Sequence, residues 1–187
     1  MFTERENNAV KYLEITEFTE LGVKAYFSTR HSGVSKGNYF SLNLAFHTED
    51  IGENIRKNRE IFCNSLNIDY NKIVAGEQIH GSKVYRVKKS DIGRGASSLK
   101  DHIPAVDAMI TNIPGIPLVS FYADCVPLYI YDTVNHAVGL AHAGWKGTVF
   151  KIGYKTIKSM KEVFKTRTEN CLVAIGPSIS RKHFEVG

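Results

Sequence analysis

The stretch HAVGLAHAGWKG, residues 136–147, joins the two kinds of element that decide the fold of this chain. Its first half is apolar and predicts a strand that ends at His142. Gly144 and Gly147 then turn the chain. Apolar residues recur after the turn at helical spacing and mark the inner face of a helix: Val149, Ile152, Thr156, Met160 and Val163.

Strand-like segments dominate the rest of the chain. They are short, rich in strand-forming residues and bounded by turn residues, and they cover residues 23–29, 72–78, 83–87, 107–111, 117–122, 126–131 and, as a final buried strand, 171–175. One more helix is predicted from the spacing of Ile51, Ile55, Phe62 and Leu66, with Asp50 as its N-cap. This pattern predicts a mixed α/β fold in which helices cover the sheet, without a domain boundary.

The composition excludes several classes of protein. A chain of 187 residues is long enough for one domain with a sizeable core, and no apolar run is long enough to span a membrane. The polar, acid-containing start is not that of a secretory signal. The three cysteines are odd in number and widely spaced, which argues against a disulfide framework. We therefore expect a cytoplasmic protein without a membrane partner.

The charge of the chain favours anionic small molecules over nucleic acid. The formal net charge is +5 and the basic residues are scattered along the sequence. The basic motif with interleaved aromatic residues that is typical of RNA-binding sheets is missing, so we expect no nucleic-acid partner. A basic surface can still attract an anionic substrate such as phosphate.

Three short blocks carry the chemistry: QIHG at residues 78–81, ADCVP at 123–127 and AHAGWKG at 141–147. They supply His80, Cys125 and His142, a three-ligand set of the catalytic zinc type that leaves a fourth position for water or substrate. Each ligand lies at a predicted strand end, and ligands at the ends of neighbouring strands can converge on one point. The alternative for each residue is an ordinary packed cysteine or hydrogen-bonded histidine.

These blocks also resemble a known family over nearly the whole chain. The shared segments are TRHSGVS (29–35), SLNL (41–44), QIHG (78–81), Asp107 with Ala108, ADCVP (123–127), HAGWKG (142–147), IGP (175–177) and FEVG (184–187). They run in the order of the YfiH/YlmD family. That family was first labelled polyphenol oxidase or laccase-domain and later assigned purine nucleoside phosphorylase and adenosine deaminase activity.

The resemblance implies a fold, a metal and substrates. The fold is similar to a four-layer α/β/β/α arrangement with mixed sheets, here a single domain over residues 1–187 that lacks the C-terminal segment of the family. The metal ligands of the family fall on His80, Cys125 and His142, with zinc as the implied metal and copper as the older assignment. The implied partners are a purine nucleoside and phosphate, and we expect a monomer or homodimer.

Further site residues follow from the resemblance and from charge. Arg30 and Lys146 are predicted to hold the phosphate as charge-assisted donors, and Asn43, in the SLNL block, to contact the substrate. Lys146 stands where the family usually has Arg, and it lacks the planar fork that grips phosphate in two places. Deamination needs a carboxylate to shuttle protons, and Asp124 and Glu77 are the nearest in sequence to the ligands. Asp124 has an equal alternative role in orienting the site.

The same residues are compatible with three other functions. The first is a copper-dependent polyphenol oxidase, although true multicopper sites need close H-x-H pairs and the 7 histidines here form none. The second is a metal-free hydrolase with Cys125 as nucleophile and His80 or His142 as base, which matches a proposed role of the family in editing peptidoglycan precursors. The third is a zinc-bearing interaction module without catalytic activity.

Overall fold

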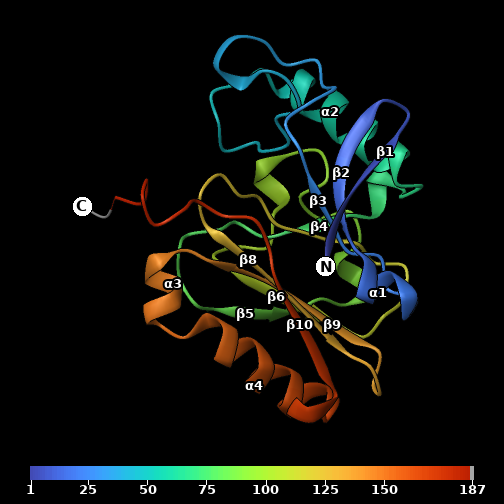
Figure 1. Ribbon diagram of the computed structural model, residues 1–187, viewed down its shortest axis with the longest axis vertical. Coiled ribbons are helices and arrows are strands. Elements are labelled where there is room, and N and C mark those ends of the chain that lie inside the picture. Colours follow the sequence, from blue (N-terminus) through green and yellow to red (C-terminus); the bar gives the residue numbers. More distant parts are fainter. Residues whose placement is uncertain (186–187) are drawn as a thin grey trace. The chain divides into compact units, whose positions relative to one another are not determined.

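A computed structural model gives the structure of the chain and describes residues 1–185 (Figure 1). The chain divides into two compact units. The first consists of residues 1–74 and 92–102, and the second of residues 75–91 and the chain from Ile103 onward. The strand β4 (Val74–Ala75) lies at the first boundary between them in sequence.

The first unit is built from an antiparallel sheet and two helices. Its strands β1 (Phe2–Asn7), β2 (Val10–Ile15) and β3 (Tyr26–Ser28) pair in the order of the sequence. The helices are α1 (Thr16–Glu20) and α2 (Gly52–Ser65). The strand predicted at 23–29 is confirmed for residues 26–28, whereas the β1–β2 hairpin was not predicted. Asn8 and Ala9 form its tip with φ of 49° and 62°, which asparagine tolerates better than most residues.

The second unit is a five-stranded mixed sheet with helices on it. Its strands run in the order β10-β8-β9-β6-β5, antiparallel except for the parallel pair β5–β6. The bounds are β5 (Val84–Arg86), β6 (Ala108–Thr111), β8 (Val126–Asp132), β9 (Ala137–Ala143) and β10 (Cys171–Ile175), with the short β7 (Leu118–Val119) outside this sheet. The predicted mixed α/β fold is thus confirmed.

The helices of the second unit explain its core. α3 (Trp145–Val149) and α4 (Ile152–Phe164) replace the single helix predicted there, because Lys151 adopts a left-handed backbone with φ of 60° and interrupts it. α4 lies along the sheet and contacts β9, β6 and β5 (Figure 1). Met160 and Phe164 of α4 pack on Ile110 and Ile130 of the sheet. Of the residues predicted for the inner face, Ile152, Thr156 and Met160 are buried, whereas Val149 lies in α3 and is 67% exposed, so its part of the prediction is wrong.

Two local predictions are wrong. The N-cap of α2 is Ile51, not Asp50, whose carboxylate accepts the Ile51 N–H at 2.8 Å just before the helix. Strand β10 is not buried: Val173 is 52% and Ile175 66% exposed. Among residues 1–185, β10 is the last strand of its sheet and pairs only with β8, so an apolar sequence here does not mean a covered strand.

None of the helices formed by residues 1–185 has the length and apolar character needed to cross a bilayer.

Candidate metal centre

The three predicted ligands converge in the second unit. The ligand atoms of His80, Cys125 and His142 all lie within 4.8 Å of one another. The two imidazole rings meet edge to face, with centroids 4.9 Å apart. His142 is buried, Cys125 is half-buried and His80 is exposed, so the group opens to solvent on one side. The predicted convergence of residues from three distant parts of the sequence is therefore found in the structure.

Strand register brings Cys125 and His142 together. In the antiparallel pair β8–β9, Val126 is opposite Ala143 and Pro127 is opposite His142. Cys125 comes directly before β8, and it therefore faces the end of β9 where the chain turns at Gly144. His80 lies between β4 and β5 and has a left-handed backbone with φ of 59°. A histidine in this region is uncommon and needs local support.

Gly144 provides the space in which the three side chains meet. A Cβ atom at this position would lie 3.0 Å from Cδ2 of His80, 3.2 Å from Sγ of Cys125 and 3.8 Å from Cε1 of His142. Gly147 is needed for a related reason, since its Cβ would lie 2.9 Å from the carbonyl oxygen of Gly81. The glycines of the HAGWKG block therefore permit a close approach that side chains would prevent.

Asp107 is the central hydrogen-bond acceptor of the site. Its Oδ1 accepts from Nδ1 of His142 at 2.9 Å and from the backbone N–H of His80 at 3.0 Å. Its Oδ2 accepts from the N–H groups of Gly81 at 2.8 Å and Ile79 at 3.3 Å. Burial raises the pKa of Asp107, but the hydrogen bonds from His142, Gly81 and Ile79 outweigh it and hold the pKa below its ordinary value. The carboxylate thus stays ionised at neutral pH.

Gln78 ties two of the sequence blocks together. Its Nε2 donates to the carbonyl oxygen of Phe121, and its Oε1 accepts from the N–H of Phe121, both at 2.8 Å. This two-point bond fixes the segment that leads to Cys125 against the segment that carries His80. Neither Gln78 nor Asp107 was predicted as a site residue. Both lie in the shared blocks, but their roles depend on contacts 26 to 43 residues away in sequence.

The surroundings of Cys125 favour the thiol over the thiolate in the absence of a cation. Burial raises the pKa of this thiol, and the negative charges of Asp124 and Asp107 raise it further. A metal cation reverses this balance because a coordinating thiol is deprotonated.

The other predicted residues of the second unit lie close to the ligands in sequence and are exposed. Lys146 places its ammonium 5.4 Å from the ring centroid of Trp145, which is itself half-exposed. Asp124 is exposed, and its backbone carbonyl accepts the N–H of Ile179 at 3.1 Å. Glu77 is engaged elsewhere, since its carboxylate accepts the Ala105 N–H at 3.1 Å. The proton-shuttling role of Asp124 stays a prediction.

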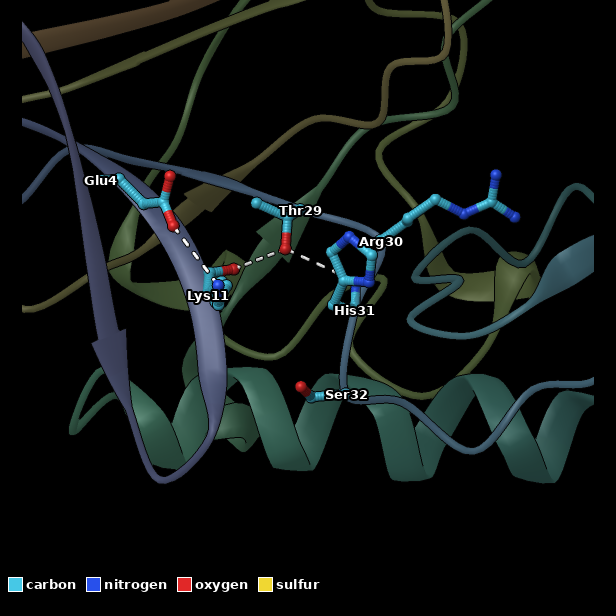
Figure 2. Close-up of a pocket in the computed structure, with 6 residues that line it drawn as sticks. All are labelled: Glu4, Lys11, Thr29, Arg30, His31 and Ser32. Carbon is cyan, nitrogen blue, oxygen red and sulfur yellow. Dashed lines mark hydrogen bonds and ion pairs between the residues drawn. The ribbon is translucent and has the colours of Figure 1, made fainter.

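Arg30 belongs to the first unit and lines a pocket of about 570 Å³ there (Figure 2). Figure 2 shows its side chain extending away from the other labelled side chains, and its guanidinium donates to the carbonyl oxygen of Phe40. Other polar groups of the pocket are paired with each other: Lys11 with Glu4 at 3.6 Å, and Thr29 with the carbonyl oxygen of Lys11 at 2.8 Å. Phosphate binding by Arg30 stays a prediction.

Asn43 also belongs to the first unit, where its amide has structural partners. Its Nδ2 donates to Thr48 at 2.8 Å and to Asp50 at 3.0 Å, and its Oδ1 accepts from the Ala45 N–H at 3.1 Å. These bonds shape the loop before α2. Substrate binding by Asn43 likewise stays a prediction.

The residues fit a transition metal. Two imidazoles and one thiol form a borderline-soft donor set suited to zinc, and a three-ligand site leaves a position for substrate. The hydrogen bond from His142 to a carboxylate is the usual second-layer support of a metal-bound histidine. The space left by Gly144 at the centre of the three side chains completes the fit. Fold and site together define the class: a mixed α/β protein with a candidate His–Cys–His metal centre.

The family follows from comparison of the sequence with known families. Residues 24–187 match the family described as "Multi-copper polyphenol oxidoreductase laccase", and the chain belongs to this family. The family description names copper, whereas the chemistry of the three donors does not by itself choose between copper and zinc.

Relatives and solved structures agree with this assignment. The chain is 39% identical to "Purine nucleoside phosphorylase YlmD" of Bacillus subtilis (strain 168), over 84% of this chain and 57% of the relative. It is 33% identical to "Purine nucleoside phosphorylase" of Bacteroides thetaiotaomicron, over 88% of this chain and 61% of the relative. The chain thus spans about three fifths of the length of these relatives.

The crystal structures of YfiH from Bacillus licheniformis and YlmD from Geobacillus stearothermophilus match the fold. The TM-scores are 0.92 and 0.90, at 30% and 32% identity. The matches cover 97% and 96% of this chain, and 67% and 66% of the crystallised chains. The YfiH-like fold predicted from the sequence is confirmed.

Proposed function

We propose that this protein is a zinc-dependent purine nucleoside phosphorylase that also deaminates adenosine. The observation that carries the proposal is the meeting of His80, Cys125 and His142 within 4.8 Å in a chain whose relatives are named purine nucleoside phosphorylases. The substrates are adenosine or inosine, with phosphate as the second substrate. Three free cysteines, without a disulfide among the described residues, fit a reducing compartment, and we place the protein in the cytoplasm.

The zinc ion is held by His80, Cys125 and His142 in this proposal. When bound, it supplies Lewis acidity that polarises a group of the substrate. Lys146 attracts and orients the phosphate from the exposed first turn of α3, and Trp145 beside it offers a half-exposed ring on which a purine can stack. Asp124, exposed beside Cys125, accepts and returns the proton that deamination requires.

One observation favours a second function. The Cys125 thiol lies within 4.8 Å of the His142 imidazole, which is hydrogen-bonded to the Asp107 carboxylate, and a Cys–His hydrolase uses these three groups in this order. Burial and two acidic neighbours raise the pKa of Cys125, however, and a metal-free nucleophile needs the opposite shift. We therefore prefer the metal-dependent reaction.

The test is a phosphate-dependent assay on purified protein of known metal content. We expect stoichiometric zinc, release of hypoxanthine from inosine only when phosphate is added, and loss of turnover on chelation with recovery on added zinc. Equal release without phosphate would indicate a hydrolase. Full turnover in folded, metal-free protein would exclude the metal mechanism.

The cysteines of the chain provide a matched control. Cys125→Ala removes a ligand and should abolish both zinc binding and turnover. Cys171→Ala changes a half-buried cysteine of the same sheet, whose Sγ contacts the carbonyl oxygen of Arg167 at 3.6 Å, and should keep both. Iodoacetamide should label Cys125 much faster after the metal is removed, because a thiolate bound to zinc is shielded.

A further inference from the structure

Asp107 contacts two of the three ligand residues, and the contacts are of different kinds. With His142 it shares a side-chain hydrogen bond of 2.9 Å, and its own backbone carbonyl accepts the His142 N–H at 2.7 Å. With the His80 segment it makes three bonds to consecutive backbone N–H groups, those of residues 79, 80 and 81. One buried carboxylate is thus shared between two segments that are 62 residues apart, counted from residue 80 to residue 142.

The bond to His142 decides which ring nitrogen is available. An ionised carboxylate can only accept hydrogen bonds, so the Nδ1 atom that faces it carries the proton. In the neutral imidazole, Nε2 then keeps its lone pair and can bind a metal. This hydrogen-bonded pair is closed to water, since the side chains of His142 and Asp107 are 4% and 0% exposed. The tautomer is therefore set before any ligand arrives.

The bonds to residues 79–81 stabilise the unusual backbone of His80. A left-handed φ of 59° costs a histidine free energy unless the surroundings impose it. Three N–H groups that point at one carboxylate impose this turn. Gly81 is part of the arrangement, because its N–H donates to Oδ2 of Asp107 at 2.8 Å.

We infer that Asp107 is a positioning residue that assembles the His80 and His142 ligands in the metal-free protein, and that zinc affinity depends on it. The part of this inference that concerns zinc affinity rests on the proposed metal function. The positioning of the two histidines concerns the protein without metal. Asp107 is not one of the three ligands, and it acts through its hydrogen bonds to the two histidines.

Asp107→Asn is the most informative variant. It keeps the size of the side chain but replaces one acceptor oxygen by an amide that donates, so the bonds to the backbone of residues 79–81 and to His142 can no longer all form. We expect the zinc dissociation constant, measured by competition with a chelating dye, to rise about 10–100-fold. Asp107→Ala should act in the same direction, with a larger effect.

Asp132→Asn is the matched control. Asp132 is also fully buried in the same sheet and also accepts backbone N–H groups, from Val134 and Asn135 at 3.0 and 3.1 Å. It contacts none of the three ligands by any hydrogen bond found among residues 1–185. Both variants should lower the free energy of unfolding, whereas only Asp107→Asn should weaken zinc binding.

Two readouts on metal-free protein separate this inference from the proposed function. Long-range ¹H–¹⁵N NMR should show the Nδ1–H tautomer of His142 in the wild type, and amide exchange of residues 79–81 should accelerate in Asp107→Asn but not in Asp132→Asn. An Nε2–H tautomer in the wild type, or unchanged zinc affinity and unchanged exchange in Asp107→Asn, would overturn the inference. A wild type that binds no zinc would refute the metal function alone, because the tautomer and exchange still decide the role of Asp107.

Discussion

Gly144 is the residue on which the geometry of the metal centre depends most directly. A Cβ added to Gly144 would lie between the side chains of the three ligands, within 4 Å of an atom of each of His80, Cys125 and His142. Its φ of −67° is ordinary for any residue, so the requirement for glycine is one of space and not of backbone conformation.

We expect Gly144→Ala to weaken zinc binding about 10–100-fold, the range found when the support of a metal ligand is displaced. Contacts of 3.0 and 3.2 Å would force His80 or Cys125 to move. Gly52→Ala is the control, since the nearest atoms to its Cβ are 3.9 Å away on a flexible arginine, and it should leave zinc affinity unchanged. Equal affinity in Gly144→Ala and the wild type would show that the three side chains do not bind one ion.

At this scale, the sequence predicts the ligands but not what supports them. His80, Cys125 and His142 can be found because few residue types bind transition metals and because each lies where a predicted strand ends. Asp107 and Gln78 could not be found in the same way. A carboxylate or an amide has many ordinary roles, and only the folded chain shows that one collects three backbone N–H groups and the other bonds Phe121 twice.

Among the secondary structure elements, strand β10 departs most from its prediction. Its sequence CLVAI is apolar throughout and predicts a buried strand. In the structure it is an edge strand whose Leu172, Val173 and Ile175 are partly exposed. An apolar sequence indicates that a strand tends to be buried. Whether the strand is buried depends on its place in the sheet and on whether α4 extends over it.

An exposed apolar edge strand is a site at which chains associate. We therefore expect Val173→Lys to reduce concentration-dependent self-association, measured by light scattering, because a lysine on an edge strand opposes pairing with another strand. The free energy of unfolding should change by no more than about 0.5 kcal/mol, as for other exposed positions.

Val134→Lys is the control for this prediction. Val134 is 62% exposed in the turn between β8 and β9, and the substitution adds the same charge away from the sheet edge. An equal reduction of scattering in both variants would mean that net charge, and not the edge of β10, controls association.

The molecule as a whole consists of two compact units, and the candidate metal centre draws all three ligands from one of them. Segments 78–81, 121–126 and 141–147 of the second unit are held together there by the bonds of Gln78 and Asp107. The sequence did not indicate this division, because the first unit takes residues 92–102 from a polar loop whose sequence has no apolar period. Arg30 and Asn43 belong to the first unit, and their contribution to substrate binding stays a prediction.

A ligand that binds only the folded form stabilises the part of the protein that must be folded to bind it. Free zinc at 100 times its dissociation constant should therefore slow amide exchange through unfolding of β8 and β9 on the order of 100-fold. Hydrogen exchange followed by mass spectrometry measures this directly, with α2 in the first unit as the internal reference and Cys125→Ala as the variant that should show no gain. Equal protection of α2 would mean that the two units unfold as one cooperative body. If β8 and β9 gained no protection, zinc would not be bound by His80, Cys125 and His142, and the metal-dependent function would be wrong.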